Sequence, residues 1–374
     1  MNNPTRYVPI LKWKRAEESA LKNLDDAQKE FMTPLVELVM PKPKLYKDKE
    51  KKIKKTDEEI FNELIHIFKQ ERIAKIPEEI VKSWGHNPIY IDYSLLYTVQ
   101  LKKESIEKIS ALGSQLGLTL IPVINLSDDE EIKKTVALYA KKGSGLCLRI
   151  VSSDFTSIEK LNEKIDIFIR TFGLTKANID LLIDLKNIKE IDGSYQKFIG
   201  LSQKINNLME WRNFIFASGA FPEDLSKCNL DDSNLIPRFD WLNWNSQIKS
   251  GKLKRNPTFA DYTIRHPIYN ESFQFFAPTT SIKYTRENDW LIMKGKKQKF
   301  ELYLANAKLL STDTDIYYGE NFSFGDKYIA EKGRYYDKYI KNPKIHGTGS
   351  TETWITAGIN HHLVCTISQI ANLI

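Results

Sequence analysis

The sequence predicts an α/β protein, a (β/α)8 barrel of the TIM type with a β-rich insertion between its eighth strand and its eighth helix. Three observations lead to this prediction. Eight short apolar runs alternate with amphipathic stretches along the chain. Most of these runs are continuously apolar, which is typical of parallel strands covered by helices on both faces. The interval from Tyr7 to Thr263 also matches the length of about 250 residues that such a barrel needs.

The strand candidates are rich in aliphatic, β-branched and aromatic residues. They are Tyr7–Trp13, Pro34–Val39, Pro88–Tyr93, Thr119–Leu126, Gly145–Val151, Ile179–Leu185, Asn213–Ser218 and Thr258–Thr263. Pro122 lies inside the fourth candidate and is unfavourable in a central strand, because proline cannot donate a ladder hydrogen bond.

The helix candidates between these runs carry apolar residues at helical spacing, and several open with capping or acidic residues. They are Ala16–Asn23, Asp57–Glu71, Lys103–Leu116, Ser127–Lys141, Ser157–Thr171 and Gly193–Leu208. The long connection 219–257 contains the segment Arg238–Trp244, which fits either a short strand or a helix. An open doubly wound sheet is therefore an alternative. That fold usually has a glycine-rich first turn, which the segment after Lys12 lacks.

The pattern changes after residue 264. Three antiparallel strands are expected at 273–276, 281–286 and 290–294, with a hairpin turn at 287–289, and 311–345 is expected to be an ordered loop. A last helix is expected from Gly347 to about Leu373. The predicted organisation is a barrel body over 1–263, an insertion or lid over 264–346, and a final helix over 347–374 that packs back on the barrel.

Composition excludes several classes of protein. Hydrophobic residues make up 41%, which is too many for a disordered chain. No apolar run approaches the roughly 18 residues of a membrane span and no apolar signal segment opens the chain, so a cytoplasmic protein without membrane contact is expected. The three cysteines form no CxxC pair, which argues against a zinc ribbon. The net charge of +7 is mild, and the lysine-rich run 42–55 is interpreted as a solvated loop, with phosphate-backbone contact as the second interpretation.

Polar residues end nearly every strand candidate, and in a barrel these ends meet at the active face. They are Lys12, Lys14, Glu37, Asp92, Asn125, Arg149, Asp184, Ser218 and Asp261. One interpretation is a self-satisfied polar layer in which the carboxylates pair with Lys12, Arg149 and Lys186. The other is a site in which Glu37, Asp92, Asp184 and Asp261 act as acids and bases or hold a divalent cation.

A glycine-containing segment opens the last helix. Gly347, Gly349, Ser350 and Thr351, with His346 before them, suit a phosphate bound at a helix N-terminus. The alternative is an ordinary N-cap. The chain has no P-loop signature.

The histidines carry no metal-binding signature. His361 and His362 are adjacent and point about 100° apart on a helix, and no HExxH sequence exists. The main interpretation is that the histidines are ordinary buried or capping residues. A minor alternative is that His266, His346 and one of the two helical histidines converge on one site. Ser218 lies in no GxSxG elbow, which argues against a hydrolase triad.

Several short motifs together resemble the prokaryotic and phage "beta protein" family. They are Tyr7-Val-Pro-Ile-Leu-Lys-Trp-Lys, Thr33-Pro-Leu-Val-Glu, Ile91-Asp-Tyr, Ala217-Ser-Gly-Ala-Phe-Pro, Phe259-Ala-Asp-Tyr and Gly349-Ser-Thr-Glu-Thr-Trp followed by His361-His-Leu. The resemblance covers nearly the whole chain and implies a setting of phage–host conflict. It transfers no catalytic residue. Family members often carry glycine where this chain has Ala260.

Two functions are expected. The first is a barrel of anti-phage or mobile-element systems that binds a phosphorylated or nucleic-acid-derived ligand. Whether it also hydrolyses a phosphodiester or glycosidic bond there is left open. Lys12, Lys14 and Arg149 would neutralise phosphate there. The second is a non-enzymatic recognition or scaffold subunit of a defence complex that docks on a protein partner through 264–346.

Overall fold

The computed structural model describes residues 6–42, 56–190, 193–230, 232–269, 279–343 and 347–373. Most of the lysine-rich run, the expected strand at 273–276 and His346 lie outside the described residues.

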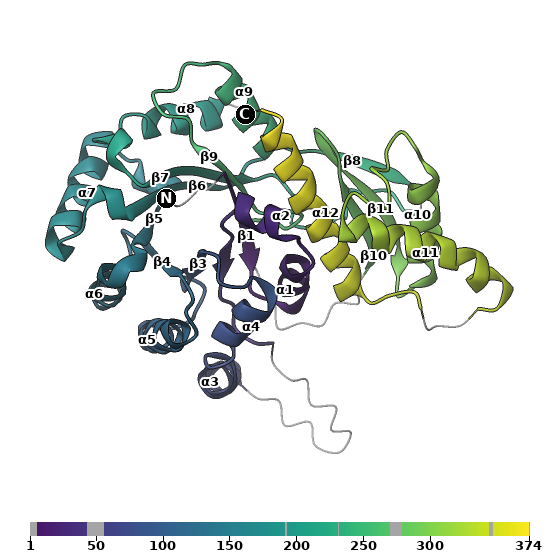
Figure 1. Ribbon diagram of the computed structural model, residues 1–374, viewed down its shortest axis with the longest axis horizontal. Helices are drawn as coiled ribbons and strands as arrows, with labels where there is room; N and C mark the ends of the chain where they lie inside the picture. Colours follow the sequence, from purple (N-terminus) through teal and green to yellow (C-terminus); the bar gives the residue numbers. More distant parts are fainter. Residues whose placement is uncertain are drawn as a thin grey trace.

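Eight parallel strands close into a barrel, in the order β1-β2-β3-β4-β5-β6-β7-β9 (Figure 1). They are β1 (Tyr7–Lys12), β2 (Leu35–Glu37), β3 (Ile89–Asp92), β4 (Leu120–Asn125), β5 (Leu146–Val151), β6 (Ile179–Asn187), β7 (Asn213–Gly219) and β9 (Thr258–Asp261). All eight predicted strands are present, the barrel is confirmed, and the open-sheet alternative is wrong. Pro122 is the last residue of β4 that pairs with β3, and the pairing with β5 begins at Val123.

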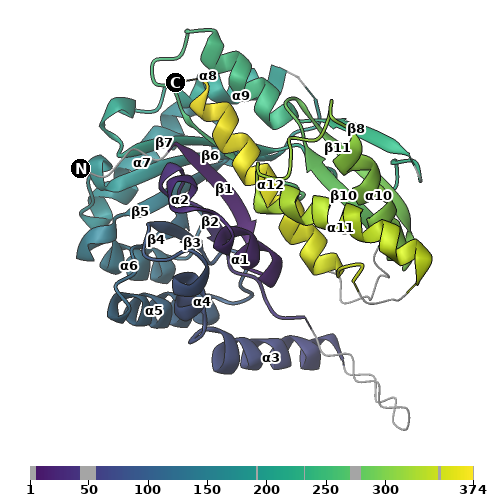
Figure 2. The ribbon, with the colours of Figure 1, turned by 45° about the vertical axis from the view of Figure 1, so that its right-hand side comes forward.

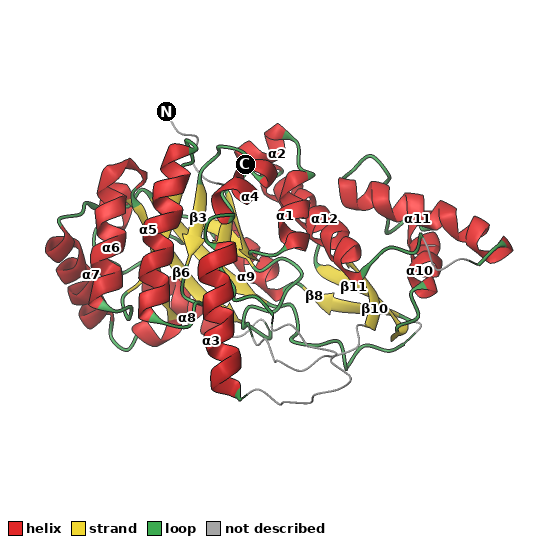
Figure 3. Cartoon of the chain, turned by 90° about the horizontal axis from the view of Figure 1, so that it is seen from below, coloured by secondary structure: helices red, strands yellow, loops and turns green. Residues whose placement is uncertain are grey.

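Helices surround the strands, as the view from below shows (Figure 3). They are α1 (Arg15–Lys22), α2 (Asp26–Phe31), α3 (Asp57–Ile67), α4 (Ile76–Ser83), α5 (Val99–Gln115), α6 (Glu130–Tyr139), α7 (Ile158–Phe172), α8 (Gly193–Ser202) and α9 (Phe239–Lys249). The ambiguous segment Arg238–Trp244 is therefore the start of a helix. No helix in the described part of the chain is long and apolar enough to cross a bilayer.

The barrel interior is a packed apolar core. Its side chains come from alternate residues of the strands: Val8, Ile10, Leu35, Tyr90, Ile121, Val123, Cys147, Leu182, Ile215, Ala217, Ala260 and Tyr262. Because side chains alternate along a strand, the next inward position after Ile10 is Lys12, and the next after Leu35 is Glu37. The same alternation brings charged side chains to the carboxyl end of the barrel.

A second, antiparallel sheet has the strand order β10-β11-β8. Its strands are β8 (Ser233–Pro237), β10 (Thr279–Thr285) and β11 (Asp289–Lys297), and the predicted 287–289 turn joins the last two. The edge strand β8 comes from the connection between β7 and β9, so the sheet is built from two separate parts of the chain. Sequence reasoning did not find this contribution.

The expected ordered loop at 311–345 is wrong, because α11 (Phe324–Lys341) occupies half of it. The helix α10 (Glu301–Thr312) precedes it. The Ser323 side chain caps α11. The buried face of α11 includes small residues such as Gly325. A Cβ atom on Gly325 would lie 2.2 Å from the Ala357 carbonyl oxygen. Because α11 packs closely on α12 through small residues, its sequence shows only a weak stripe of large apolar side chains, the usual sign of a buried helix face.

The last helix, α12 (Thr351–Ala371), lies between the barrel and the small sheet (Figure 2). It packs against α1, α11 and β10, and it occupies the place of the eighth barrel helix. The Asn360 side chain donates a 3.1 Å hydrogen bond to the Ala20 carbonyl of α1. Helix α12 therefore holds the insertion against the barrel.

Candidate ligand site at the barrel mouth

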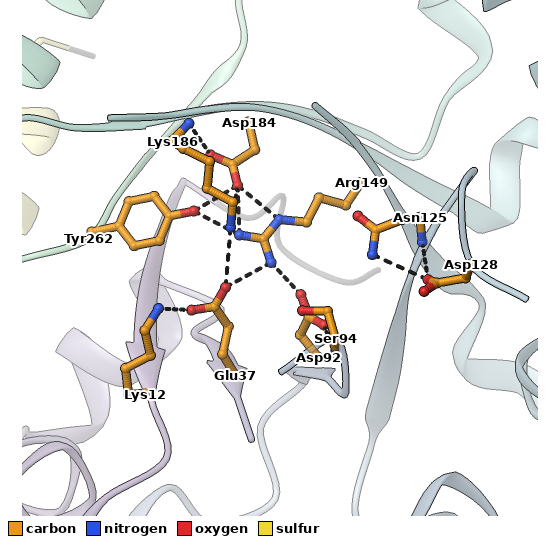
Figure 4. A network of polar contacts seen from close by, with 10 residues as sticks. All are labelled: Lys12, Glu37, Asp92, Ser94, Asn125, Asp128, Arg149, Asp184, Lys186 and Tyr262. Carbon is orange, nitrogen blue, oxygen red and sulfur yellow. Dashed lines mark hydrogen bonds and ion pairs between the residues drawn. The ribbon is translucent and has the colours of Figure 1, made fainter. Parts of the chain in front are cut away.

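A ring of charged side chains closes the carboxyl end of the barrel (Figure 4). Lys12, Glu37, Asp92, Arg149 and Asp184 come from β1, β2, β3, β5 and β6, and all five are buried. The structure thus brings together five of the residues that the sequence predicts for the mouth.

Arg149 is the centre of the ring and is 1% exposed. Its Nε and Nη2 donate to Asp184 Oδ2 at 2.9 and 2.6 Å, and its Nη1 donates to Glu37 Oε1 at 3.0 Å. Nη1 also donates to Asp92, and Nη2 donates to the Tyr262 hydroxyl at 2.7 Å. One guanidinium therefore holds three carboxylates, as its rigid fork of donors allows.

Two lysines complete the charge balance. Lys12 pairs with Glu37, and the Lys186 ammonium lies 3.3 Å from Asp184 Oδ2 and 3.5 Å from Glu37 Oε1. Lys186 has a left-handed backbone with a φ of 57°, and its N–H donates to Asp184 Oδ1 at 2.8 Å. Three cations thus face three carboxylates, and the self-satisfied polar layer is confirmed. Any action of these carboxylates on a ligand stays a prediction.

The ion pairs keep the ring carboxylates ionised. Burial by itself would raise the pKa of Glu37, but the charges of Lys12, Arg149 and Lys186 outweigh it and lower that pKa to about 2. Burial would also raise the pKa of Asp184, but the charges of Lys186 and Arg149 outweigh it and lower that pKa. A carboxyl with so low a pKa is a poor proton donor at neutral pH.

The low pKa of Glu37 predicts a loss of stability in acid. Its usual value is 4.5 and the folded value is about 2, so the ion pairs stabilise the fold fully above about pH 5. This stabilisation, about 3 kcal/mol for Glu37, should disappear as pH falls through 2. Urea unfolding at pH 7, 5 and 3 measures it. E37Q should flatten the acid decrease, whereas E320Q at an exposed pair with Arg334 should not. Equal stability at pH 7 and pH 3 would contradict the prediction.

Four predicted strand-end residues do not join the ring. Ser218 is buried within β7, and Lys14 follows the end of β1 as the first residue before α1. The Asp261 carboxylate lies outside the barrel wall, where it accepts from the Tyr7 hydroxyl at 2.7 Å and contacts His362 Nε2 at 2.8 Å. Its placement at the mouth is corrected, because Ala260 and Tyr262 are the inward residues of this segment. Asn125 donates to Asp128 at 3.2 Å in its own loop.

The glycine segment before α12 is a helix cap. The Ser350 side chain accepts a hydrogen bond from the Thr353 amide at 3.2 Å, as the N-cap interpretation predicts. Gly347 and Gly349 have φ values of 106° and 84°, and a Cβ on Gly349 would lie 2.2 Å from the Tyr328 hydroxyl. The glycines therefore allow close packing on α11. Contact of Thr351 or its neighbours with an anion stays a prediction.

The adjacent histidines are buried and serve different partners. His361 contacts Asp326 through Nδ1 at 2.8 Å and the Thr285 carbonyl through Nε2 at 2.7 Å, whereas His362 contacts Asp261. The interpretation as buried histidines is confirmed for this pair. Within the described ranges, no three His, Cys, Asp or Glu side chains are grouped so as to hold a metal ion. The divalent cation, which the sequence offers as one of two interpretations, thus stays a prediction without a donor cluster to support it.

A hollow of about 240 Å³ lies beside the ring, between the barrel mouth and the small sheet. Its lining residues are Lys12, Lys14, Glu17, Phe221, Pro222, Glu223, Asp224, Leu225, Ile264, Arg265, His266, Ile268, Tyr269 and Lys283. The cations come from β1 and the turn that follows it, from the loop after β9 and from β10. One wall is apolar, and the hollow shares Lys14, Glu17 and Arg265 with a longer groove of about 940 Å³.

The ionic partners around the hollow are incomplete. Arg265 donates from Nε and Nη2 to Glu17 Oε1 at 3.2 and 3.0 Å. The other oxygen, Glu17 Oε2, is buried without a hydrogen-bond partner in the described part of the chain. The Lys283 ammonium lies 4.6 Å from the Phe221 ring centre and makes neither a hydrogen bond nor an ion pair with any described residue. Burial, aided by Arg265, lowers the pKa of Lys283 to about 7.

Sequence reasoning missed Lys283, Arg265 and Glu17. In β10, Lys283 lies on the face opposite Ile282 and Tyr284, and those two belong to the core of the small sheet. Such alternation predicts only a solvent-facing lysine. The packing of the small sheet against α12 and the barrel makes that face a wall of the hollow, and no local pattern reports this packing.

The fold and the site together define a TIM-type barrel with an internally neutralised ring at its mouth and, next to it, a hollow lined by cations, carboxylates and apolar side chains. The sequence model of the Beta protein family matches residues 7–368, nearly the whole chain. The chain therefore belongs to the Beta protein family, and the resemblance seen in its motifs is confirmed. A comparison with curated proteins finds no match.

Proposed function

We propose that this protein binds a small phosphorylated ligand, such as a nucleotide or a fragment of nucleic acid, in the hollow beside the charged ring. The observation that carries the proposal is the Lys283 ammonium, which faces the hollow and makes neither an ion pair nor a hydrogen bond with a described residue. A partly buried charge without a partner costs free energy, and a bound anion would offset that cost.

The other lining residues support an anionic ligand with an apolar part. Lys12, Lys14 and Arg265 add positive charge around the same volume. Phe221 and Tyr269 offer aromatic surface, and the Lys14 ammonium already lies 4.7 Å from the Tyr269 ring centre. Phosphate contacts with lysine and arginine, combined with aromatic packing, are common in nucleotide recognition.

Binding rather than hydrolysis is the activity that we propose. Glu37, Asp92 and Asp184 are each held by Arg149, so none is available as a general base unless an ion pair opens. The setting of phage–host conflict belongs to the same proposal and rests on the family resemblance. Binding through this hollow would let the protein detect a nucleotide-type signal there.

Titration calorimetry with pyrophosphate, AMP and ATP tests the proposal. At pH 6.5 the wild type should bind at least one of these probes, and K283M should bind it about 10- to 100-fold more weakly, the effect of one lost charge-assisted contact. Affinity should also fall from pH 6 to pH 8, because the Lys283 ammonium loses its proton near pH 7.

The matched control is K297M, which removes an exposed lysine from the neighbouring strand β11. It should bind as the wild type does. Thermal melting should show K283M to be at least as stable as the wild type, since the variant removes an uncompensated charge. Absence of saturable binding by the wild type, or equal binding by K283M, would disprove the proposal. The second expected function, docking on a protein partner through 264–346, does not depend on ligand binding by the wild type or on its loss in K283M.

A further inference from the structure

We propose that the Lys283 amine forms a reversible imine with an aldehyde or ketone group of an anionic ligand in the hollow. The inference rests on the proposed function, because it adds a carbonyl group to the anionic ligand described above. It assigns Lys283 the role of a covalent attachment point.

The position of Lys283 gives its nitrogen lone pair access to a ligand. Other lysines near the mouth use their nitrogen in polar contacts: Lys12 pairs with Glu37, and Lys186 pairs with Asp184. Lys294, on β11, donates to the Leu225 and Cys228 carbonyls at 2.6 and 2.9 Å. Lys283 has no such contact with a described residue and lines the hollow.

The surroundings of Lys283 favour the neutral amine. The apolar Phe221 ring lies against its nitrogen, and the Arg265 guanidinium is a nearby like charge. Desolvation and a neighbouring cation are the two means by which proteins prepare lysines for attack on carbonyl groups. With a pKa of about 7, about half of the Lys283 side chains are neutral at pH 7.

Glu17 supplies a proton acceptor and donor on the same hollow. Arg265 holds Glu17 Oε1, and the buried Oε2 is left without a partner among the described residues. The negative charge of Glu17 opposes the pKa decrease at Lys283, which places the two groups within electrostatic range. A carboxylate in this position can carry protons during imine formation.

The proposed step is balanced without an oxidant or a reductant. The Lys283 nitrogen attacks the carbonyl carbon, and a proton passes from nitrogen to the carbonyl oxygen to give a carbinolamine. That hydroxyl then leaves as water with a second proton, and the C=N bond forms. Lys12, Lys14 and Arg265 would hold the anionic end of the ligand during the reaction.

Borohydride trapping with pyridoxal 5′-phosphate, an aldehyde that carries a phosphate, tests the inference. After reduction and digestion, mass spectrometry should find Lys283 labelled about tenfold or more above Lys297 at pH 7, because exposed lysines are almost wholly protonated. Labelling of Lys283 should increase from pH 6 to pH 8, opposite to the trend for pyrophosphate affinity. Pyridoxal, which lacks the phosphate, should label Lys283 more weakly.

Two variants and a competitor separate the possible outcomes. K283R should remove the specific label and K297R should not, while pyrophosphate should reduce labelling at Lys283 only. If pyrophosphate binds through Lys283 but the label spreads evenly over exposed lysines, the imine is disproved and the proposed function stands. If Lys283 is labelled but none of pyrophosphate, AMP and ATP competes, the proposed function fails and the amine reactivity stands. If neither effect occurs, both are disproved.

Discussion

Replacing Arg149 by methionine is expected to destabilise the protein by about 3–5 kcal/mol or to prevent folding, because it leaves buried carboxylates without their main partner. The variant leaves Glu37, Asp92 and Asp184 buried at the barrel mouth with only Lys12 and Lys186 to pair with them. Repulsion among the three carboxylates adds to the cost of their burial. Urea unfolding followed by far-UV circular dichroism measures the loss.

The control for this variant is R334M. Arg334 also forms a two-pronged pair, with Glu320 at 2.6 and 3.0 Å, but its side chain is 59% exposed. Removal of a solvent-exposed pair should cost less than about 1 kcal/mol. R149K keeps the positive charge but not the forked guanidinium, so its loss of stability should lie between the losses in R334M and R149M. A loss below about 1 kcal/mol in R149M would show that the ring does not stabilise the barrel.

Replacing His361 by alanine is expected to cost about 3 kcal/mol or more, because the side chain joins three elements at a fully buried position. Its ring contacts Asp326 of α11 and the Thr285 carbonyl of β10, and it stacks on Tyr284 at 3.9 Å between ring centres. Burial would raise the pKa of Asp326, but His361, Ser323 and Tyr284 outweigh it and lower that pKa. Without His361, the Asp326 carboxylate loses its 2.8 Å contact with the Nδ1 atom of that ring.

Hydrogen exchange distinguishes this effect from a general loss of stability. In H361A, amides of β10 and α11 should exchange faster, while those of β5 and β6 should change less, because His361 joins the small sheet to α12. H86A is the control, since His86 is exposed and makes one long contact at 3.4 Å with the Gly117 carbonyl. Unchanged stability in H361A, or uniform acceleration of exchange over the chain, would contradict the prediction.

The ring and the hollow differ in their ionic partners, and this difference explains why we assign them different roles. Every charged side chain of the ring has a partner of opposite charge within the ring, so its main effect is to stabilise the mouth of the barrel. In the hollow, Lys283 makes no ion pair with a described residue, and Glu17, although paired with Arg265, keeps its Oε2 without a hydrogen-bond partner there. Uncompensated polar groups are kept where function offsets their cost to stability.

The barrel was predictable from the chain because its signals are local. Each strand is a short apolar run, and each helix between the strands repeats its apolar residues at helical spacing. Inward and outward positions along a strand follow from alternation, so the amino-acid pattern alone places Arg149 and Asp184 at one mouth. Asp261 could not be placed in this way, because both faces of a barrel strand are apolar and the eighth run alone does not show that Ala260 and Tyr262 are its inward residues.

The sequence by itself determined the closed barrel, the charged ends of its strands and membership of the Beta protein family. Only the tertiary structure decided that the ring charges neutralise one another, that β8 joins a distant sheet, and that Lys283 faces a hollow instead of solvent. The physical reason is the range of the interactions. Periodicity and propensity act over a few neighbouring residues, whereas ion pairing and the packing of a sheet against a barrel join residues more than a hundred positions apart, such as Glu37 and Arg149.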